Sequence, residues 1–287
     1  MASTNNIYTT IEFMKPDMTK VEKRIADFLL NNTERIVDLA LADVASECSC
    51  GEASVIRFCR KVGCTGFTDA KTMLATHIVP DNLTQINIPS GSKLHTEEII
   101  DQICSLYENT LQRTMQLNTP DKFKKACEII SHADSLYLFG IGDALIPCLC
   151  AYYRFRRIGI PCYFSADADM QIIHAANIKK EDVAIAISHS GKTRHVVEAM
   201  KTAKEAGAYT ISISQSARSP MSKYSDLEFY NAVSDITIDK TIVAHRLAEN
   251  TIVEILYAGV VVLMPEQANE ILKKSAEILA VNKESDS

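Results

Sequence analysis

A hydroxyl-rich turn follows an apolar strand in the second half of the chain. The segment is Val183-Ala-Ile-Ala-Ile-Ser-His-Ser-Gly-Lys-Thr193, and the residues that follow it are predicted to form a helix. The hydroxyls of Ser188, Ser190 and Thr193 would join free backbone N–H groups at the positive end of that helix, which is an arrangement that suits an anion. Gly191 lets an anion approach the backbone closely. We therefore expect a phosphate group to bind at this turn.

A second glycine turn, Gly140-Ile-Gly142, ends an earlier apolar run. Both turns approximate nucleotide-binding motifs without completing them. A P-loop would need glycine at Ala186, and a dinucleotide fingerprint would need a small residue at Leu145. Each glycine taken alone also fits a purely structural turn. Because the carboxyl ends of parallel strands meet at one edge of a sheet, the two turns are expected to form two walls of one site.

A short predicted helix over residues 52–62 has the chemistry for DNA contacts on one face. Apolar residues recur at helical spacing from Val55 to Val62 and form its buried side. A tight turn and a preceding short helix complete a helix-turn-helix pattern. A plain solvated helix face remains the alternative. The residues expected to contact guanine edges or phosphates are Ser54, Arg57, Arg60 and Lys61.

Charge and composition bound the class of protein. The chain has 287 residues and is 47 % hydrophobic and 23 % charged, which excludes a mostly disordered, collagen-like or membrane-embedded chain. Its formal net charge of −6 argues against a polyanion-binding protein when taken whole. However, residues 1–77 carry nine Lys or Arg against ten Asp or Glu, and Arg57 to Lys71 holds four cations with only Asp69. Basic charge is therefore concentrated near the predicted recognition helix.

The nine cysteines include no CxxC pair, so we expect reduced thiols and no metal. A zinc site is a weak alternative, since the spacing of its four candidates fits no common finger pattern. Those candidates are Cys48, Cys50, Cys59 and Cys64.

Neither export nor a membrane span is expected. Met1 to Thr10 has no basic residue ahead of an apolar core, so it is interpreted as a frayed leader of a cytoplasmic protein. The apolar run Ile255 to Met264 is half of the roughly 20 residues that a membrane span needs.

The periodicity of the chain changes after the first third. The sequence pattern predicts helices to about residue 77. Two prolines indicate a linker near Pro80–Ser92, and a helix is predicted after it over residues 96–117. Five β-rich runs then alternate with helical stretches, and a final helix covers about 240–263. The β-rich runs are Leu136–Phe139, Cys162–Phe164, Val183–Ser188, Thr210–Ser214 and Leu227–Tyr230.

The predicted fold is an all-α helix-turn-helix domain followed by an α/β domain with a five-stranded, mostly parallel sheet flanked by helices. The predicted boundaries are 1–78 for the helix-turn-helix domain, 79–120 for a linker and connecting helix, 121–265 for the α/β domain, and 266–287 for a helix end and tail.

The combination resembles the RpiR-type transcriptional regulators. Thr19 to Ala75 is similar to their N-terminal helix-turn-helix. Phe139-Gly-Ile-Gly142, Ile187 to Thr193 and Ser219 to Asp226 resemble the sugar isomerase (SIS) domain that follows it in that family. The resemblance implies a homodimer or homotetramer that binds an operator and senses a phosphosugar, without a cofactor and without a membrane.

The resemblance also assigns ligand residues. The phosphate-binding turn maps onto Ser188, His189, Ser190, Gly191, Lys192 and Thr193, and the first turn onto Gly142 and Ala144. Ala144 stands where the family usually has a serine that contacts phosphate. His245 and Arg246 replace a common Ser-Arg pair and are weaker ligand candidates. Gly51 stands where a serine usually caps the recognition helix.

The predicted function is regulation of sugar metabolism genes, with operator affinity modulated by a phosphosugar bound to the SIS domain. The alternative is a phosphosugar isomerase with an accessory helical domain, which would need a base such as His189, His195, His245 or Glu249. No partner in the sequence pairs with these groups, so no catalytic residue is assigned and we expect a protein that is not an enzyme. A third option, a SIS adaptor that controls another protein, would not need the cations of residues 57–61.

Overall fold

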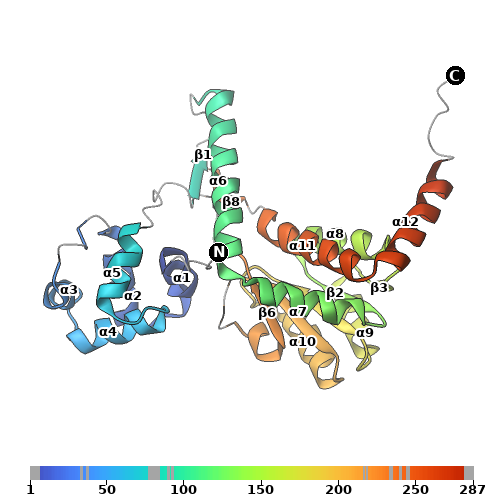
Figure 1. Ribbon diagram of the computed structural model, residues 1–287, viewed down its shortest axis with the longest axis horizontal. Helices are drawn as coiled ribbons and strands as arrows, with labels where there is room; N and C mark the ends of the chain where they lie inside the picture. The colour runs from blue at the N-terminus through green and yellow to red at the C-terminus, as the bar shows by residue number, and fades with distance from the viewer. Residues whose placement is uncertain are drawn as a thin grey trace. The chain divides into compact units, whose positions relative to one another are not determined.

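The structure of the chain is a computed structural model (Figure 1). It describes residues 7–32, 35–36, 39–76, 85–88, 91, 94–215, 217, 219–232, 235–238, 241–243 and 246–280. The chain divides into two compact units. Unit 1 contains Met1–Leu117 and Ala232–Val243, and unit 2 contains Asn118–Asn231 and Ala244–Ser287. The segment 232–243 thus returns to unit 1 from within the predicted α/β domain, and the exact domain boundaries stay a prediction.

The N-terminal part of unit 1 is a cluster of helices around one apolar core. A capping box starts the helix at Lys20, because Glu22 N donates to Thr19 Oγ1 at 3.3 Å and Thr19 N donates to Glu22 Oε2 at 2.8 Å. The frayed leader is wrong from Ile7 onward, since Ile7 and Ile11 are buried in this core. The elements are α1 (Ile7–Met14), the 3-10 turn η1 (Lys15–Asp17), α2 (Lys20–Asn31), α3 (Leu41–Glu47), α4 (Glu52–Lys61) and α5 (Phe67–Thr76).

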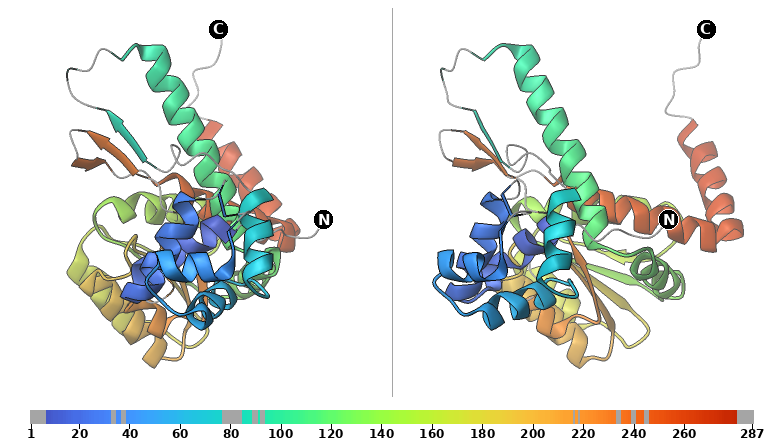
Figure 2. Two further views of the ribbon diagram at one scale, coloured as in Figure 1. Left: turned by 90° about the vertical axis from the view of Figure 1, so that its left-hand side faces the viewer. Right: turned by 60° about the vertical axis from the view of Figure 1, so that its left-hand side comes forward.

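Unit 1 also contains a small sheet beside the long helix α6 (Thr96–Leu117), as Figure 2 shows. Strand β1 (Gln85–Ile88) pairs in parallel with β7 (Asp235–Ile238), which pairs antiparallel with β8 (Thr241–Val243). Strand β1 lies inside the predicted linker, and β8 lies inside the predicted final helix. The prediction of helix from residue 240 is therefore wrong over β8, and the helix begins at Leu247.

The five-stranded sheet of unit 2 confirms the predicted fold. Its order is β3-β2-β4-β5-β6, and every strand pair is parallel. Its strands are β2 (Leu136–Phe139), β3 (Cys162–Tyr163), β4 (Val183–Ile187), β5 (Tyr209–Ser214) and β6 (Leu227–Tyr230).

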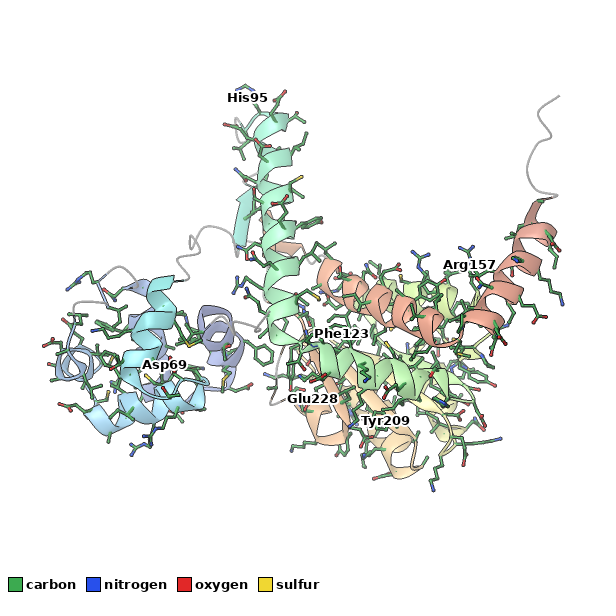
Figure 3. All side chains as sticks on the ribbon, viewed as in Figure 1. Asp69, His95, Phe123, Arg157, Tyr209 and Glu228 are labelled. Carbon is green, nitrogen blue, oxygen red and sulfur yellow. The ribbon has the colours of Figure 1, made fainter. Side chains whose placement is uncertain are left out.

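Helices cover both faces of this sheet (Figure 1). One face packs against α7 (Pro120–Ser131), α8 (Leu145–Arg156) and α11 (Leu247–Leu263), and the other packs against α9 (Ala168–Ala176) and α10 (Arg194–Glu205). Strands buried on both faces are apolar throughout, which is why β2 and β4 were visible in the sequence. Phe123 of α7, labelled in Figure 3, places its ring centroid 4.8 Å from that of Phe229 on β6.

A separate helix, α12 (Pro265–Leu279), stands where the sequence predicted the end of the preceding helix. The predicted polar tail lies outside the described residues, beyond residue 280. Pro265 starts α12, because proline cannot continue α11. Within the described residues, no single helix passes the length and apolarity test for crossing a membrane; α11 and α12 pass it only as a pair, bent by 108°.

Candidate functional site

The predicted phosphate turn joins β4 to α10 at the carboxyl edge of the sheet. Gly191 has φ +63°, and its N–H donates to Ser188 O at 3.0 Å. The hydroxyls of Ser188 and Thr193 lie 3.1 Å apart, and Lys192 N donates to Ser190 Oγ at 3.3 Å. Thr193 is the N-cap of α10, yet its side chain makes no capping hydrogen bond. The first turn of α10 therefore keeps backbone donors for an anion.

Neighbouring elements hold this turn in place. Ser188 N donates to Ile213 O at 3.1 Å, and Gln215 N donates to His189 O at 2.9 Å, so the end of β5 fixes both sides of the turn. Ser219 packs so closely that a Cβ on Gly191 would lie 2.3 Å from its Oγ. Only glycine fits here without a shift of the backbone, and the turn is preorganised.

The second wall is the Gly140–Ala144 turn, which ends β2 beside β4. Gln171 of α9 is 1 % exposed and clamps this turn, since Gly140 N donates to its Oε1 at 3.0 Å. Its Nε2 donates to Gly140 O at 2.7 Å and to Ser165 O at 2.8 Å. Sequence reasoning missed Gln171, because α9 also carries the polar residues Asp169 and His174 and nothing in its pattern singles out the glutamine. Ala144, where the family usually has serine, is buried against the apolar core.

Arg246 links the two walls. Its Nη1 lies 3.2 Å from His189 Nδ1 in the phosphate turn, and its Nη2 lies 3.6 Å from Asp143 Oδ2 in the first turn. Glu249 Oε1 lies 3.7 Å from the same ring nitrogen, so the guanidinium and this carboxylate together hold the imidazole. The structure thus brings Arg246 to the predicted site, whereas His245 lies outside the described residues.

A buried carboxylate stands behind Arg246. Glu249 is 2 % exposed, and its Oε1 accepts from Asn231 Nδ2 at 3.3 Å and lies 3.5 Å from Arg246 Nη1. The carboxylate offsets the charge of the guanidinium and fixes its direction. His195, which was also considered as a catalytic base, lies on α10 and is exposed.

Of the four cysteines considered as zinc ligands, Cys48, Cys59 and Cys64 are buried and Cys50 is half-buried. Burial raises the pKa of Cys59 to about 12, so this thiol stays protonated at neutral pH. Within the described ranges, no three His, Cys, Asp or Glu side chains lie close enough together to hold a metal ion.

Helix α4 carries all four predicted DNA-contacting residues, of which two are exposed and two are half-buried. Arg57 and Arg60 are exposed, and Arg57 Nη2 donates to the half-buried Ser54 Oγ at 3.1 Å. Lys61 differs, because its ammonium forms an ion pair with Glu22 of α2. Its assignment to DNA stays a prediction, whereas its link between α2 and α4 is structural.

Replacement of Lys61 with glutamine is expected to lower stability by about 0.5–1 kcal/mol at pH 7, because the ion pair is lost. Burial alone would raise the pKa of Glu22, but hydrogen bonds from Lys61 and Thr19 outweigh it and leave this pKa below its ordinary value. When the pKa of a carboxyl group is lower in the folded state, its charge stabilises the fold at any pH above the pKa of the unfolded state. This stabilisation is lost as the pH falls through the pKa of the folded state. Thermal unfolding temperatures of the parent protein and the Lys61→Gln variant should therefore differ at pH 7 and converge once the pH falls below the lowered pKa of Glu22. The exposed Lys20→Gln variant is the control, and an equal loss in that variant would refute the role of the ion pair.

Comparison with known proteins identifies both predicted domains. The family model described as helix-turn-helix domain, rpiR family, matches residues 5–80, and the SIS domain model matches residues 129–254. An uncharacterized HTH-type transcriptional regulator of Caldanaerobacter subterraneus is 30 % identical over 278 residues, covering 97 % of this chain and 98 % of the relative. The bifunctional protein glk of Paraburkholderia xenovorans is 28 % identical over 266 residues; the match covers 91 % of this chain but only 40 % of that protein.

Two solved structures share the fold. The Vibrio vulnificus NanR protein complexed with ManNAc-6P has a TM-score of 0.60 and 21 % identity, over 98 % of this chain and 100 % of that one. The sugar isomerase domain of an RpiR transcription factor from Sphaerobacter thermophilus has a TM-score of 0.56 and 21 % identity, over 63 % of this chain and 99 % of that one. With full-length similarity to an HTH-type regulator and both domain models in the expected order, the chain belongs to the RpiR family of helix-turn-helix transcriptional regulators that carry a SIS domain.

Proposed function

We propose that this protein binds operator DNA through α4 and that a sugar phosphate bound at the SIS domain changes its affinity for that DNA. The observation that carries the effector half is the preorganised turn from Ser188 to Thr193, with Arg246 held beside it. The proposed complex is a homodimer or homotetramer on a palindromic site, located in the cytoplasm with its DNA. No reaction is assigned to the SIS domain.

The proposed phosphate position is the space in front of the first turn of α10. Ser190 and Lys192 are exposed there and able to turn toward a ligand, while the buried Ser188 hydroxyl orients that of Thr193. Backbone donors at a helix N-terminus and the guanidinium of Arg246 would both stabilise the negative charge. The NanR structure of the same fold was solved with ManNAc-6P, which supports a phosphosugar as the class of effector.

Regulation then follows from linkage. A sugar phosphate that binds the DNA-competent and the DNA-incompetent geometries unequally shifts operator affinity, and one that binds both equally shifts nothing. Arg246 touches both walls of the site, so a ligand that draws the guanidinium toward its phosphate would also change its contact with Asp143.

Ser190→Ala is expected to weaken the response to a sugar phosphate by about tenfold or more, because a hydroxyl bonded to a charged group contributes roughly 1.5–3 kcal/mol. A panel of hexose and amino-sugar 6-phosphates, with inorganic phosphate alongside, would be screened by thermal shift and then by DNA binding. Ser131→Ala on α7 is the control. An unchanged response in Ser190→Ala would refute the proposal that this turn binds the phosphate. Turnover of a sugar phosphate by the pure protein would favour the alternative of a phosphosugar isomerase.

Arg57→Ala is expected to weaken binding to the operator by about tenfold, since a good base-edge contact contributes roughly 1–3 kcal/mol. The operator would be a fragment selected from a random DNA library by the full-length protein. Arg156→Ala on α8 makes the same change in net charge and should leave affinity nearly unaltered. Equal affinities of Arg57→Ala and the parent protein for the selected fragment would refute α4 as the reading helix.

A further inference from the structure

A second pocket lies at the opposite edge of the same sheet. It has a volume of about 500 Å³ and is formed by residues at the amino ends of β2 and β4 together with α9. The phosphate turn lies at the carboxyl end of β4, about 16 Å away along five residues of strand. The two sites therefore share no residue.

Aromatic rings form one wall of this pocket. Tyr137 of β2 and Tyr163 of β3 are register partners on adjacent parallel strands, and their rings stack with centroids 4.6 Å apart at 20°. His174 of α9 meets Tyr163 edge-on at 5.8 Å. Tyr163 nevertheless remains 44 % exposed, which leaves part of its ring available to a ligand.

Carboxylates line the side of the pocket beside the rings. Asp134 is exposed just before β2, and Asp182 is buried just before β4. Burial, the Asp182 carboxylate and Tyr163 raise the pKa of Tyr137 to about 12, so its phenol stays neutral. Lys179 at the rim is the one cation among the lining residues.

A ring nitrogen of His174 is a further polar group in the lining of this pocket. The Nδ1 atom of His174 is buried and has no hydrogen-bond partner among the described residues. Buried polar atoms are normally paired, so this nitrogen is a polar position in the pocket lining that the described residues leave unsatisfied. Two carboxylates disfavour an anion here, and an apolar ligand would leave them without a counterion.

We propose that this pocket binds a guanidinium group, stacked on the exposed part of Tyr163 and paired with Asp134. A guanidinium is flat, stacks on aromatic faces and forms paired hydrogen bonds with carboxylates. The same chemistry comes from a free small molecule or from an arginine side chain of a polypeptide. Agmatine and the peptide acetyl-Gly-Arg-Gly-amide separate these two sources.

The test is titration of the full-length protein by calorimetry with both probes. We expect saturable binding of at least one, weakened about threefold or more by Tyr163→Leu and by Asp134→Asn. Lys179→Gln should instead tighten binding, because it removes a like charge from the rim. Glu181→Gln, an exposed neutralisation next to the pocket, should change affinity less than Asp134→Asn does.

Each outcome decides the proposal. Binding of the peptide without agmatine would assign the group to a polypeptide, and binding of agmatine would assign it to a small molecule. No saturable binding of either probe, or affinity that neither Tyr163→Leu nor Asp134→Asn alters, would overturn it. Tighter binding in Asp134→Asn together with weaker binding in Lys179→Gln, the reverse of the expected signs, would overturn it by indicating an anion site. Ser190→Ala should bind the probe like the parent protein, so failure of the effector proposal would leave this one standing.

Discussion

Replacing Gln171 with leucine is expected to lower the free energy of unfolding of unit 2 by about 3–5 kcal/mol. The side chain is 1 % exposed and makes three hydrogen bonds to backbone atoms, two to Gly140 and one to Ser165. Leucine keeps most of the volume but leaves those backbone groups without partners, and each buried unpaired group costs roughly 1–3 kcal/mol. Urea unfolding followed by tyrosine fluorescence measures this, because the chain has no tryptophan and eight of its ten tyrosines lie in unit 2.

The matched control is Gln267→Leu on α12. Gln267 is exposed, and its Nε2 reaches Ile158 O at the long distance of 3.5 Å. The same chemical change should therefore cost less than about 1 kcal/mol there. A similarly small loss of stability in both variants would mean that the Gly140 turn does not depend on its hydrogen bonds with Gln171.

The sheet of unit 2 was predictable because its signals are local. Leu136–Phe139 and Leu227–Tyr230 have the predicted bounds, since each is a short segment rich in apolar and aromatic residues between turns. The buried face of α4 was equally visible, because Val55, Phe58 and Cys59 recur at helical spacing and are all buried. In each case the residues that decide the structure lie within one turn or strand of one another.

The small sheet of unit 1 was missed because its partners are far apart in sequence. Gln85 pairs with Asp235, and Ile86 with Ile236. Each strand shows polar and apolar alternation over only four residues, which is too short to outweigh the nearby prolines of the predicted linker. Only the tertiary pairing makes these segments strands.

The same contrast holds for the effector site. The turn from Ser188 to Thr193 could be predicted because its chemistry is contiguous in the sequence. Gln171 could not, because its role depends on α9 lying against the end of β2. Likewise, nothing in the sequence predicted that Lys61 would pair with Glu22, since α2 and α4 meet only in the folded core.

Gly191→Ala is expected to destabilise unit 2 by about 2–4 kcal/mol and to remove the response to a sugar phosphate. The backbone at φ +63° costs an L residue roughly 1–2 kcal/mol, and the new Cβ would lie 2.3 Å from Ser219 Oγ and 2.4 Å from its Cβ. Relief requires the turn to move away from Ser219, which also displaces the hydroxyls of Ser188 and Thr193. Urea unfolding and the thermal-shift screen measure the two effects separately.

Comparison with Gly142→Ala separates the steric cost of Gly191→Ala from the conformational cost of a positive φ. Gly142 has φ +64°, nearly the same as Gly191, but a Cβ there would meet no atom within 4 Å. Its variant should therefore lose only the conformational cost of roughly 1–2 kcal/mol. The excess loss in Gly191→Ala then measures the contact with Ser219, and it should disappear when Ser219→Gly is added, because both clashing atoms are removed. Equal losses at the two glycines would show that the turn relaxes freely, which would contradict the preorganised phosphate turn on which the effector proposal depends.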